Sequence, residues 1–393
     1  MNKHLTHFLL LLSGLFLISA CRTESQEQKE TSTNDEPVTI SSRIRSNPDK
    51  LNPSITFMGP AIQICRMVFP TLIEYDPVTL ELGPMLAKTR PTFSTFSEGP
   101  YAGKSAYTYE IHDEAVWDNG SPVTASDYIF SLKVLFNPLV PSSPYRGLLN
   151  FIEDVITYPD QPKKLTVVIR EPYIKSEYNT GGIFVIPEYH YDPQGLLKDF
   201  KLSTLFNQEE ASKLAESDEK LKAFADEFTS TKFSHEVENV VGCGPYRVTE
   251  WKDNERVVLT KKENWWGESM GEKYTLLQAK PDQIIYVPVR DGATAVNMVK
   301  DGSIDAVKQL SNNQFLELQN SDVVKENYNL FNPDATTYNY LGLNTKSPKL
   351  EDKRVRKALA YLMDVEEVIR TAKKGMAKPI VGPVPRTSKF YHP

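Results

Sequence analysis

The stretch AYTYEIHDEAVWDNGSPVTASDYIFSLKVLFNP, residues 106–138, sets a strand, a turn and a helix in immediate succession. Apolar residues at every second position over 107–111 predict a strand with one buried face. Asp-Asn-Gly at 118–120 predicts a turn, and Thr124 with Asp127 three residues later is a typical helix-capping pair. The apolar residues that follow recur on one helical face: Ile129, Leu132 and Phe136. This succession indicates a mixed α/β chain.

The same mixture of elements continues on both sides of this stretch. Residues 38–44 begin as a short strand, and residues 246–262 alternate as a hairpin. Two capped helices are expected near the C-terminus, one opened by Asp352 and the next by Asp364. Residues 200–235 are charged and mostly helical, and we interpret them as a solvated excursion. A chain of this length is expected to form two or three domains.

The loop VVGCGPYRVTEW, residues 240–251, raises the question of what its two glycines approach. A dinucleotide cradle needs G-x-G-x-x-G opening into a helix, so that phosphate sits on the helix N-terminus. Here Pro245 follows and a strand is expected after it, so we reject a phosphate site. Gly242 and Gly244 instead allow close approach of the backbone to a neighbour. The residues leave open whether that neighbour is a ligand or another strand.

Cysteine chemistry is the other interpretation of this loop. A nucleophilic Cys243 would need a base close in the fold, and the sequence contains no HExxH or CxxC signature. His112, beside Asp113 at a strand end, is expected at the surface. We therefore predict no catalytic residue, no metal site and no cofactor. Cys65 and Cys243 are isolated in the sequence. Export would permit a disulfide between them, but we expect two unpaired thiols.

The N-terminus has the pattern of an export signal. One Lys precedes an apolar run over residues 8–20, which is shorter than the roughly 20 residues that span a bilayer but suits a signal peptide. Ile-Ser-Ala before Cys21 resembles a bacterial lipobox, in which the signal is cut before a lipidated Cys. The alternative is an ordinary signal with an incidental Cys. Residues 21–37 are almost entirely polar and are expected to form a disordered tether.

Charge limits the class of partner. The chain has 45 basic and 51 acidic residues, a formal net charge of −6. A mildly acidic body without a basic stripe is not typical of nucleic-acid binders. We therefore expect no nucleic-acid partner.

Several stretches, taken in order, resemble the extracytoplasmic solute-binding proteins of family 5, the peptide/nickel-type receptors of oligopeptide and dipeptide ABC importers. The most specific is AVWDNGSPVTASDYIFS, which is similar to the family's W-x-[DN]-G-x-P-[VL]-T-A-x-D-[VF]-x-[FY]-S. VGCGPYR is similar to G-[TN]-G-x-[YF], with Cys243 where Thr or Asn is usual. The matching segments are 51–53, 68–88, 115–138, 241–267, 340–369 and 382–385.

The resemblance implies a two-lobe α/β fold like that of periplasmic binding proteins (type II, cluster C). It assigns residues 38–69 and 186–335 to lobe I and residues 70–185 to an extra subdomain on that lobe. Residues 336–393 would begin lobe II. Family members continue past the segment GPVP, so we expect lobe II to be incomplete and the acidic partner of a peptide α-amino group to lie beyond Pro393.

The resemblance also implies a site and a function. The residues matching cleft-facing positions are Phe57, Met58, Gly59, Tyr145, Cys243, Gly244, Tyr338 and Tyr340. Phe57 and Tyr340 are equally consistent with core positions, since aromatic residues are often buried. The implied protein is a monomeric receptor, lipid-anchored at Cys21 on the outer side of a bacterial membrane. It would capture peptides between its lobes and deliver them to the permease subunits of an ABC transporter.

Other ligands and other classes stay open at this point. Within the family, a nickel chelate, haem or an oligosaccharide could replace the peptide. Outside it, the chain could be a lipid-anchored surface hydrolase or an adhesion module. The sequence does not specify peptide length, side-chain preference, affinity, cognate permease or the membrane that carries the anchor.

Overall fold

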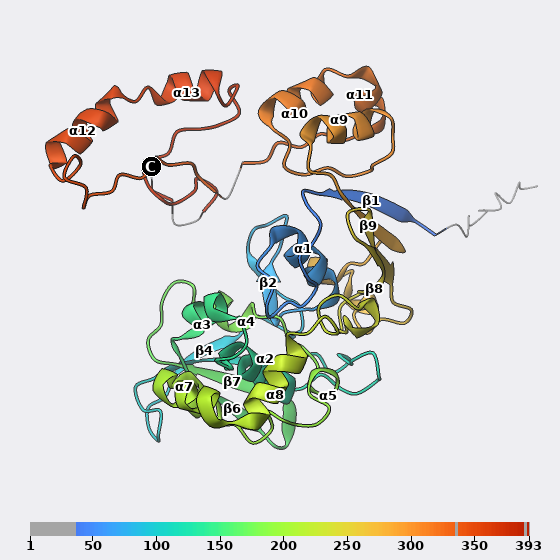
Figure 1. Cartoon of the computed structure of the whole chain (residues 1–393), viewed down its shortest axis with the longest axis vertical. Coiled ribbons are helices and arrows are strands. Elements are labelled where there is room, and N and C mark those ends of the chain that lie inside the picture. Colours follow the sequence, from blue (N-terminus) through green and yellow to red (C-terminus); the bar gives the residue numbers. More distant parts are fainter. Residues whose placement is uncertain (1–36, 335–336, 389–390, 393) are drawn as a thin grey trace, which may run out of the picture. The chain divides into compact units, whose positions relative to one another are not determined.

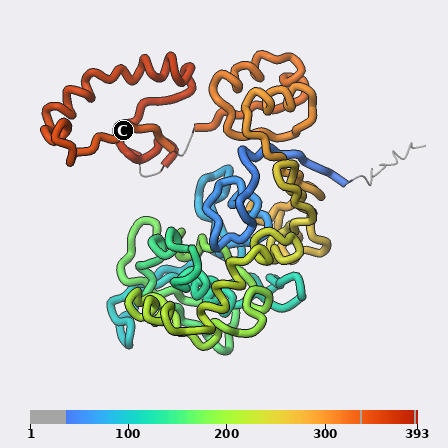
Figure 2. The backbone as a smooth tube through the Cα atoms, in the orientation of Figure 1, coloured from blue at the N-terminus to red at the C-terminus, as the bar shows by residue number. Residues whose placement is uncertain are grey.

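The N-terminal strand pairs with segments far along the chain. A computed structural model describes residues 37–334, 337–388 and 391–392. Its first sheet has the order β1-β10-β9-β8, formed by Thr39–Ile44, Gln283–Pro288, Arg256–Lys261 and Tyr246–Lys252. β1 runs parallel to β10, and the blue start of the described chain lies beside yellow-brown segments from far along the sequence (Figure 2). The predicted strand and hairpin are confirmed, and Asn254 lies in the hairpin turn with a φ of 60°.

A second four-stranded sheet contains the stretch that predicted the α/β class. Its order is β4-β5-β7-β6, formed by Thr92–Thr95, Ser105–Glu110, Gln161–Ile169 and Ile152–Tyr158. All three pairings are antiparallel. Helix α2 (Ala125–Phe136) contacts β6 and β7 (Figure 1), and the predicted capping box of Thr124 and Asp127 is present. The strand, turn and helix are therefore confirmed.

The remaining elements are short. A two-stranded sheet pairs β2 (Ile73–Tyr75) with β3 (Leu82–Pro84). The helices before β8 are α1 (Gly59–Val68), α3 (Ser143–Leu149), α4 (Ser176–Gly181), α5 (Glu188–Tyr191), α6 (Leu202–Phe206), α7 (Gln208–Ser217) and α8 (Glu219–Phe228). Single 3₁₀ turns lie at Val237–Asn239, Glu268–Met270 and Thr275–Leu277. Across the described ranges, no helix has the length and apolar character needed to cross a bilayer.

The interpretation of residues 200–235 as a solvated excursion is wrong for its last helix. One face of α8 is buried, formed by Leu221, Phe224, Ala225 and Phe228. Phe224 packs edge-on against Phe130 of α2, with ring centroids 6.0 Å apart. The spacing of these apolar residues, i, i+3, i+4 and i+7, is that of an amphipathic helix. The charged residues around them hid this stripe in the sequence.

Helices α6 and α8 therefore both contact α2, the helix that packs on the second sheet. Phe206 of α6 packs against Phe136 at 4.5 Å between centroids, and the side-chain amide of Asn137 donates to the Leu221 carbonyl. The predicted division at residue 186 assigned these helices to lobe I instead. Their contacts favour extending the subdomain to about the end of α8, and the domain boundaries stay a prediction.

The C-terminal third begins with a small separate core. Helices α9 (Gly292–Lys300), α10 (Asn312–Gln319) and α11 (Asp322–Asn327) share it, and it is formed by Val296, Val299, Ile304, Leu318 and Val324. The two predicted capped helices follow as α12 (Lys353–Leu362) and α13 (Val365–Thr371). Asp352 accepts from the Arg354 amide and Asp364 from the Glu367 amide, which confirms both caps.

Candidate functional site

The predicted loop 57–59 lies at the surface, at the start of α1. Phe57 and Met58 are 47% and 40% exposed, and a side chain added at Gly59 would meet no atom within 4 Å. Met58 caps the helix with an extended backbone and without a side-chain hydrogen bond. Extended backbone at an open surface can pair with a peptide in the manner of a strand.

Buried polar residues hold the base of this loop. Asn52 is fully buried, and its side-chain oxygen accepts from the Ser54 amide at 3.1 Å. The hydroxyl of Thr56 donates to Asp49 at 2.6 Å. These bonds satisfy the backbone and side chains of a tight turn, so Phe57 projects from a fixed support.

Tyr145 meets this loop from α3. Its ring lies 5.2 Å from that of Phe57 between centroids, tilted by 41°, and its hydroxyl donates to the Pro53 carbonyl at 3.1 Å. Burial raises the pKa of Tyr145 to about 12, so the hydroxyl stays a neutral donor at physiological pH. The structure thus brings together two predicted site residues from separate elements.

A second aromatic pair lies beyond the predicted residues. Tyr75, at the end of β2, stacks obliquely on Tyr178 of α4 with centroids 4.8 Å apart. Beside them, Arg66 of α1 forms an ion pair with Glu74, at 3.5 Å between Nη2 and Oε2. Burial raises the pKa of both Tyr145 and Tyr178, and the positive charge of Arg66 partly offsets that rise at each. Arg66 is therefore electrostatically close to both tyrosines.

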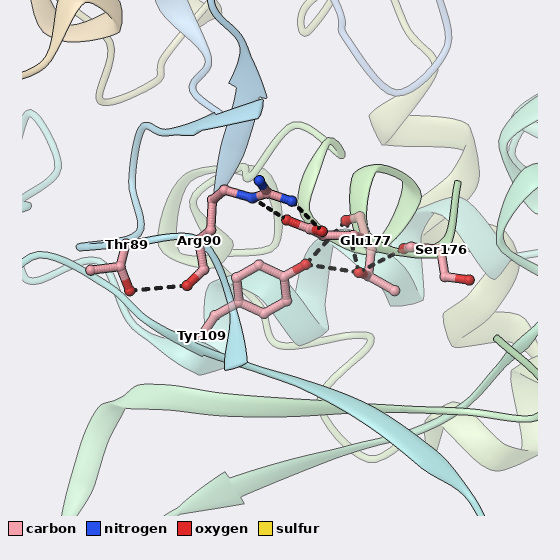
Figure 3. A network of polar contacts seen from close by, with 6 residues as sticks. Thr89, Arg90, Tyr109, Ser176 and Glu177 are labelled. Carbon is pink, nitrogen blue, oxygen red and sulfur yellow. Dashed lines mark hydrogen bonds and ion pairs between the residues drawn. The ribbon is translucent and has the colours of Figure 1, made fainter. Parts of the chain in front are cut away.

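A polar network fixes the helix that carries Tyr178 (Figure 3). The guanidinium of Arg90 donates two hydrogen bonds of 2.7 Å to the carboxylate of Glu177. On the other side, the buried Tyr109 hydroxyl lies 2.8 Å from the Thr180 hydroxyl. A side chain at Gly181 would lie 2.5 Å from Ile73, so only glycine allows α4 this close to β2.

The sequence gives only partial signals for the second aromatic pair, Tyr75 and Tyr178, and for the neighbouring Arg66. Tyr75 follows a short apolar strand, and Arg66 stands on the polar face of an amphipathic helix, four residues after Ile62. Neither pattern indicates that these residues share a surface with Tyr178. That proximity depends on the packing of α4 against β2.

The glycine loop approaches another backbone rather than open space. A Cβ at Gly242 would lie 2.2 Å from the Val68 carbonyl oxygen, and the Gly244 amide donates to the same oxygen at 2.8 Å. The Cys243 carbonyl accepts from the indoles of Trp265 and Trp266 at 2.9 and 2.8 Å. The backbone neighbour of the loop is thus the end of helix α1 rather than another strand, and a contact with the ligand stays a prediction.

Neither described cysteine has the environment of a nucleophile. Cys243 is 1% exposed and Cys65 is also buried, and both are free thiols. Burial raises the pKa of each thiol far above its usual range, which disfavours the reactive thiolate. Cys243 and Gly244 are predicted to contact the ligand, and both are buried in this structure.

His112 differs from its predicted position. Its side chain is 5% exposed, between the rings of Trp266 and Tyr274 at 5.9 and 5.6 Å. Within the described residues, its Nε2 has no hydrogen-bond partner. The expectation of a surface histidine is therefore wrong, because the strand end turns inward beneath these aromatic rings.

The other predicted residues lie apart or outside the described structure. Tyr338 and Tyr340 are 39% and 79% exposed, with ring centroids 5.7 Å apart. Within the described ranges, no ring contact or hydrogen bond joins them to Phe57 or Tyr145. Cys21 and the predicted signal and tether fall before residue 37, outside the described residues. Among the residues that are described, no group of three His, Cys, Asp or Glu side chains could hold a metal ion.

Residues 84–393 match the family described as bacterial extracellular solute-binding proteins, family 5 Middle. The chain belongs to this family, as the order of its motifs predicted.

Curated relatives and solved structures agree with this assignment. The chain is 25% identical to the dipeptide-binding protein DppE of Bacillus subtilis and 26% identical to the periplasmic oligopeptide-binding protein OppA of Salmonella typhimurium, over 70% and 68% of its length. It spans 44% of the length of each. The oligopeptide-binding protein of Thermus thermophilus with a bound pentapeptide matches with a TM-score of 0.62 and 17% identity, over 90% of this chain and 60% of that one. This likeness shows the two-lobe, periplasmic-binding-protein-like α/β fold.

Proposed function

We propose that this chain is the substrate-binding receptor of an ABC importer and that it captures peptides outside the cytoplasm. The family match over residues 84–393 carries the proposal. Relatives named for binding dipeptides and oligopeptides support peptide as the ligand class. The receptor binds its ligand and releases it unchanged, without catalysis.

The geometry around Phe57 supports a peptide as ligand. The backbone at Met58 is extended, with its amide bonded to the Thr56 hydroxyl and its carbonyl to the Ile62 amide, and the open space at Gly59 lets a second chain approach. The Phe57–Tyr145 pair supplies an apolar wall beside that backbone. In this proposal Tyr338 and Tyr340 contact the ligand from the second lobe. Cys243 and Gly244 act indirectly by fixing the end of α1.

The remaining parts of the proposal concern location and partners. Cys21 carries the lipid anchor after signal cleavage, and residues 21–37 tether a monomeric body to the outer side of the membrane. The loaded receptor docks on the permease subunits of its transporter. A single acyl chain binds membranes only marginally, so stable anchoring needs the several chains of a processed lipoprotein.

Native mass spectrometry of the protein purified from its host tests the function. We expect a population heavier than the bare chain that releases intact peptides on denaturation. Release of a nickel chelate, haem or oligosaccharide would assign another ligand of the same family. Incubation of the purified protein with a peptide mixture completes the test, because cleavage of those peptides would identify a hydrolase and contradict the proposal.

A further inference from the structure

Helix α1 connects the two aromatic pairs through its exposed face. The helix begins beside Phe57, and Arg66 lies in its last turn. Ile62 and Arg66, one helical turn apart, share a face that is not buried, whereas Ile64 and Cys65 on the opposite face are buried. A ligand lying along α1 from Phe57 would therefore reach the Arg66 side chain.

Arg66 is held less tightly by its acidic partner than Arg90 is. Its side chain is 47% exposed, and its ion pair with Glu74 spans 3.5 Å. Arg90, in contrast, donates two hydrogen bonds of 2.7 Å to Glu177. A guanidinium carries five donors in a planar fork that matches a carboxylate. Arg66 thus keeps donors that a second carboxylate could use.

Glu74 has the position of an orienting residue. Its side chain is 11% exposed, so it approaches Arg66 from the protein side of the surface. One carboxylate oxygen, Oε1, accepts from the Tyr75 amide at 2.9 Å, and the other faces Arg66. Glu74 therefore directs the guanidinium toward the surface on which Tyr75 and Tyr178 stack.

We propose that Arg66, oriented by Glu74 and flanked by the Tyr75–Tyr178 pair, binds a carboxylate of the ligand. This inference rests on the proposed peptide-binding function and adds a chemical preference to it. The preferred ligands are peptides with a free C-terminal or side-chain carboxylate that lies beyond an apolar residue held at Phe57 and Tyr145. Tyrosine hydroxyls beside the guanidinium add neutral donors to the same carboxylate.

Calorimetry on the full chain with three hexapeptide pools tests the inference. The randomised positions of every pool exclude Asp and Glu. The peptides of the first pool have free C-termini, and those of the second have amidated C-termini. The third pool has amidated C-termini and one Glu at a fixed position. We expect the first and third pools to bind roughly tenfold to hundredfold more tightly than the second, the range for a charged hydrogen bond. Arg66→Gln should abolish this difference, and Arg66→Lys should keep part of it.

Two further variants separate a ligand contact from a structural role. Glu74→Gln keeps an acceptor for the Tyr75 amide but removes the ion pair that orients Arg66, so the carboxylate preference should fall in a protein that is still folded. Arg170→Gln is the matched control, since Arg170 is 48% exposed and pairs with Glu153 at 2.9 Å. It should bind all pools as the unmodified protein does. Circular dichroism checks that each variant is folded.

The outcomes distinguish the inference from the function on which it rests. If the unmodified protein binds no pool, the peptide-receptor proposal fails and this inference fails with it. If it binds the amidated neutral pool as tightly as the others, the receptor stands and the inference is overturned. A full carboxylate preference in folded Arg66→Gln would also overturn it.

Discussion

The Tyr145 hydroxyl donates a hydrogen bond of 3.1 Å to the Pro53 carbonyl, so α3 is tied to the turn that presents Phe57. The two residues lie on separate elements, and the bond sets the angle at which the Tyr145 ring meets Phe57. A carbonyl that is partly shielded from water needs this donor, because an unpaired polar group in such a place is costly. The predicted ligand surface at Phe57 and Tyr145 therefore depends on the hydrogen bond between Tyr145 and Pro53, which holds the two elements together.

Tyr145→Phe should lower the free energy of unfolding by about 1 kcal/mol, the usual net contribution of one hydrogen bond. It should also weaken peptide binding several-fold, because the loop at Phe57 loses its tie. Tyr246→Phe is the control, since the Tyr246 hydroxyl donates to another proline carbonyl, that of Pro281, at 2.8 Å. Thermal unfolding and calorimetry check both variants. Equal effects of the two on peptide affinity would remove Tyr145 from the site.

Gly242→Ala should destabilise the protein strongly, by about 3 kcal/mol or more. The new Cβ would lie 2.2 Å from the Val68 carbonyl oxygen, and backbone cannot move as a flexible side chain can. Gly147→Ala is the matched control, because a Cβ there meets no atom within 4 Å. Alanine within helix α3 should stabilise by roughly 0.5–1 kcal/mol. Denaturant unfolding of both variants measures the contrast, and a neutral Gly242→Ala would contradict the close approach.

Cys243 and Cys65 should resist alkylation by iodoacetamide in native buffer. Both thiols are buried, and their raised pKa keeps the thiolate population low. Peptide-level mass spectrometry should show slow labelling of each, at the same rate with and without saturating peptide. Complete labelling in guanidinium chloride is the control. Rapid labelling of native Cys243 that peptide suppresses would show instead that the loop opens to the ligand.

His112 should make the protein less stable at acidic pH. Burial is the main cause that lowers the pKa of His112, so the unfolded chain takes up this proton at a higher pH than the folded one. The stability is present above the unfolded pKa of about 6.5 and is lost as pH falls through the folded pKa. His112→Phe removes this proton and keeps a ring beside Trp266 and Tyr274.

Denaturant unfolding of the protein and of His112→Phe at pH 8 and pH 5 measures this effect. Any packing cost of the substitution appears at pH 8, where the histidine is neutral in both states. The unmodified protein should then lose more stability than the variant on acidification. Equal losses would show that His112 does not contribute to the pH dependence.

Cys21→Ser should move the protein from the membrane fraction to the soluble fraction, or leave it unprocessed, if Cys21 carries the lipid. The folded body should unfold at the same temperature as before, because the predicted tether separates it from the anchor. Fractionation of host cells followed by immunoblotting measures the shift. Membrane association that persists in the variant would show that something other than Cys21 holds the protein there.

Much of the fold was predictable because its signals are local. The capping pair Thr124 and Asp127 marks the start of α2 within four residues, and Asp352 and Asp364 do the same for α12 and α13. A cap works through hydrogen bonds to amides two or three residues away, so both partners of the interaction lie within a short segment of the sequence. The hairpin of β8 and β9 is predictable for the same reason.

The candidate site was predictable only where the resemblance supplied positions. The resemblance assigned Phe57 and Tyr145 to cleft-facing positions, and the structure places their ring centroids 5.2 Å apart. Tyr75 lies in the matched segment 68–88 but was not assigned to the site, and Arg66 and Tyr178 lie outside the matched segments; the proximity of these three residues arises from helix packing. A charged residue on a helix face is usually only solvated, so its sequence pattern does not indicate a ligand.

By itself, the sequence determined the class of fold, the family and the ends of its capped helices and its hairpin, because capping, alternation and ordered motifs act over short distances. The burial of His112 and Cys243 and the pairing of β1 with β10 became clear only in the tertiary structure. The packing of the glycine loop on the end of α1 also became clear only there. These features depend on which distant segments share one core, and burial at a single position is a property of all the elements packed around it.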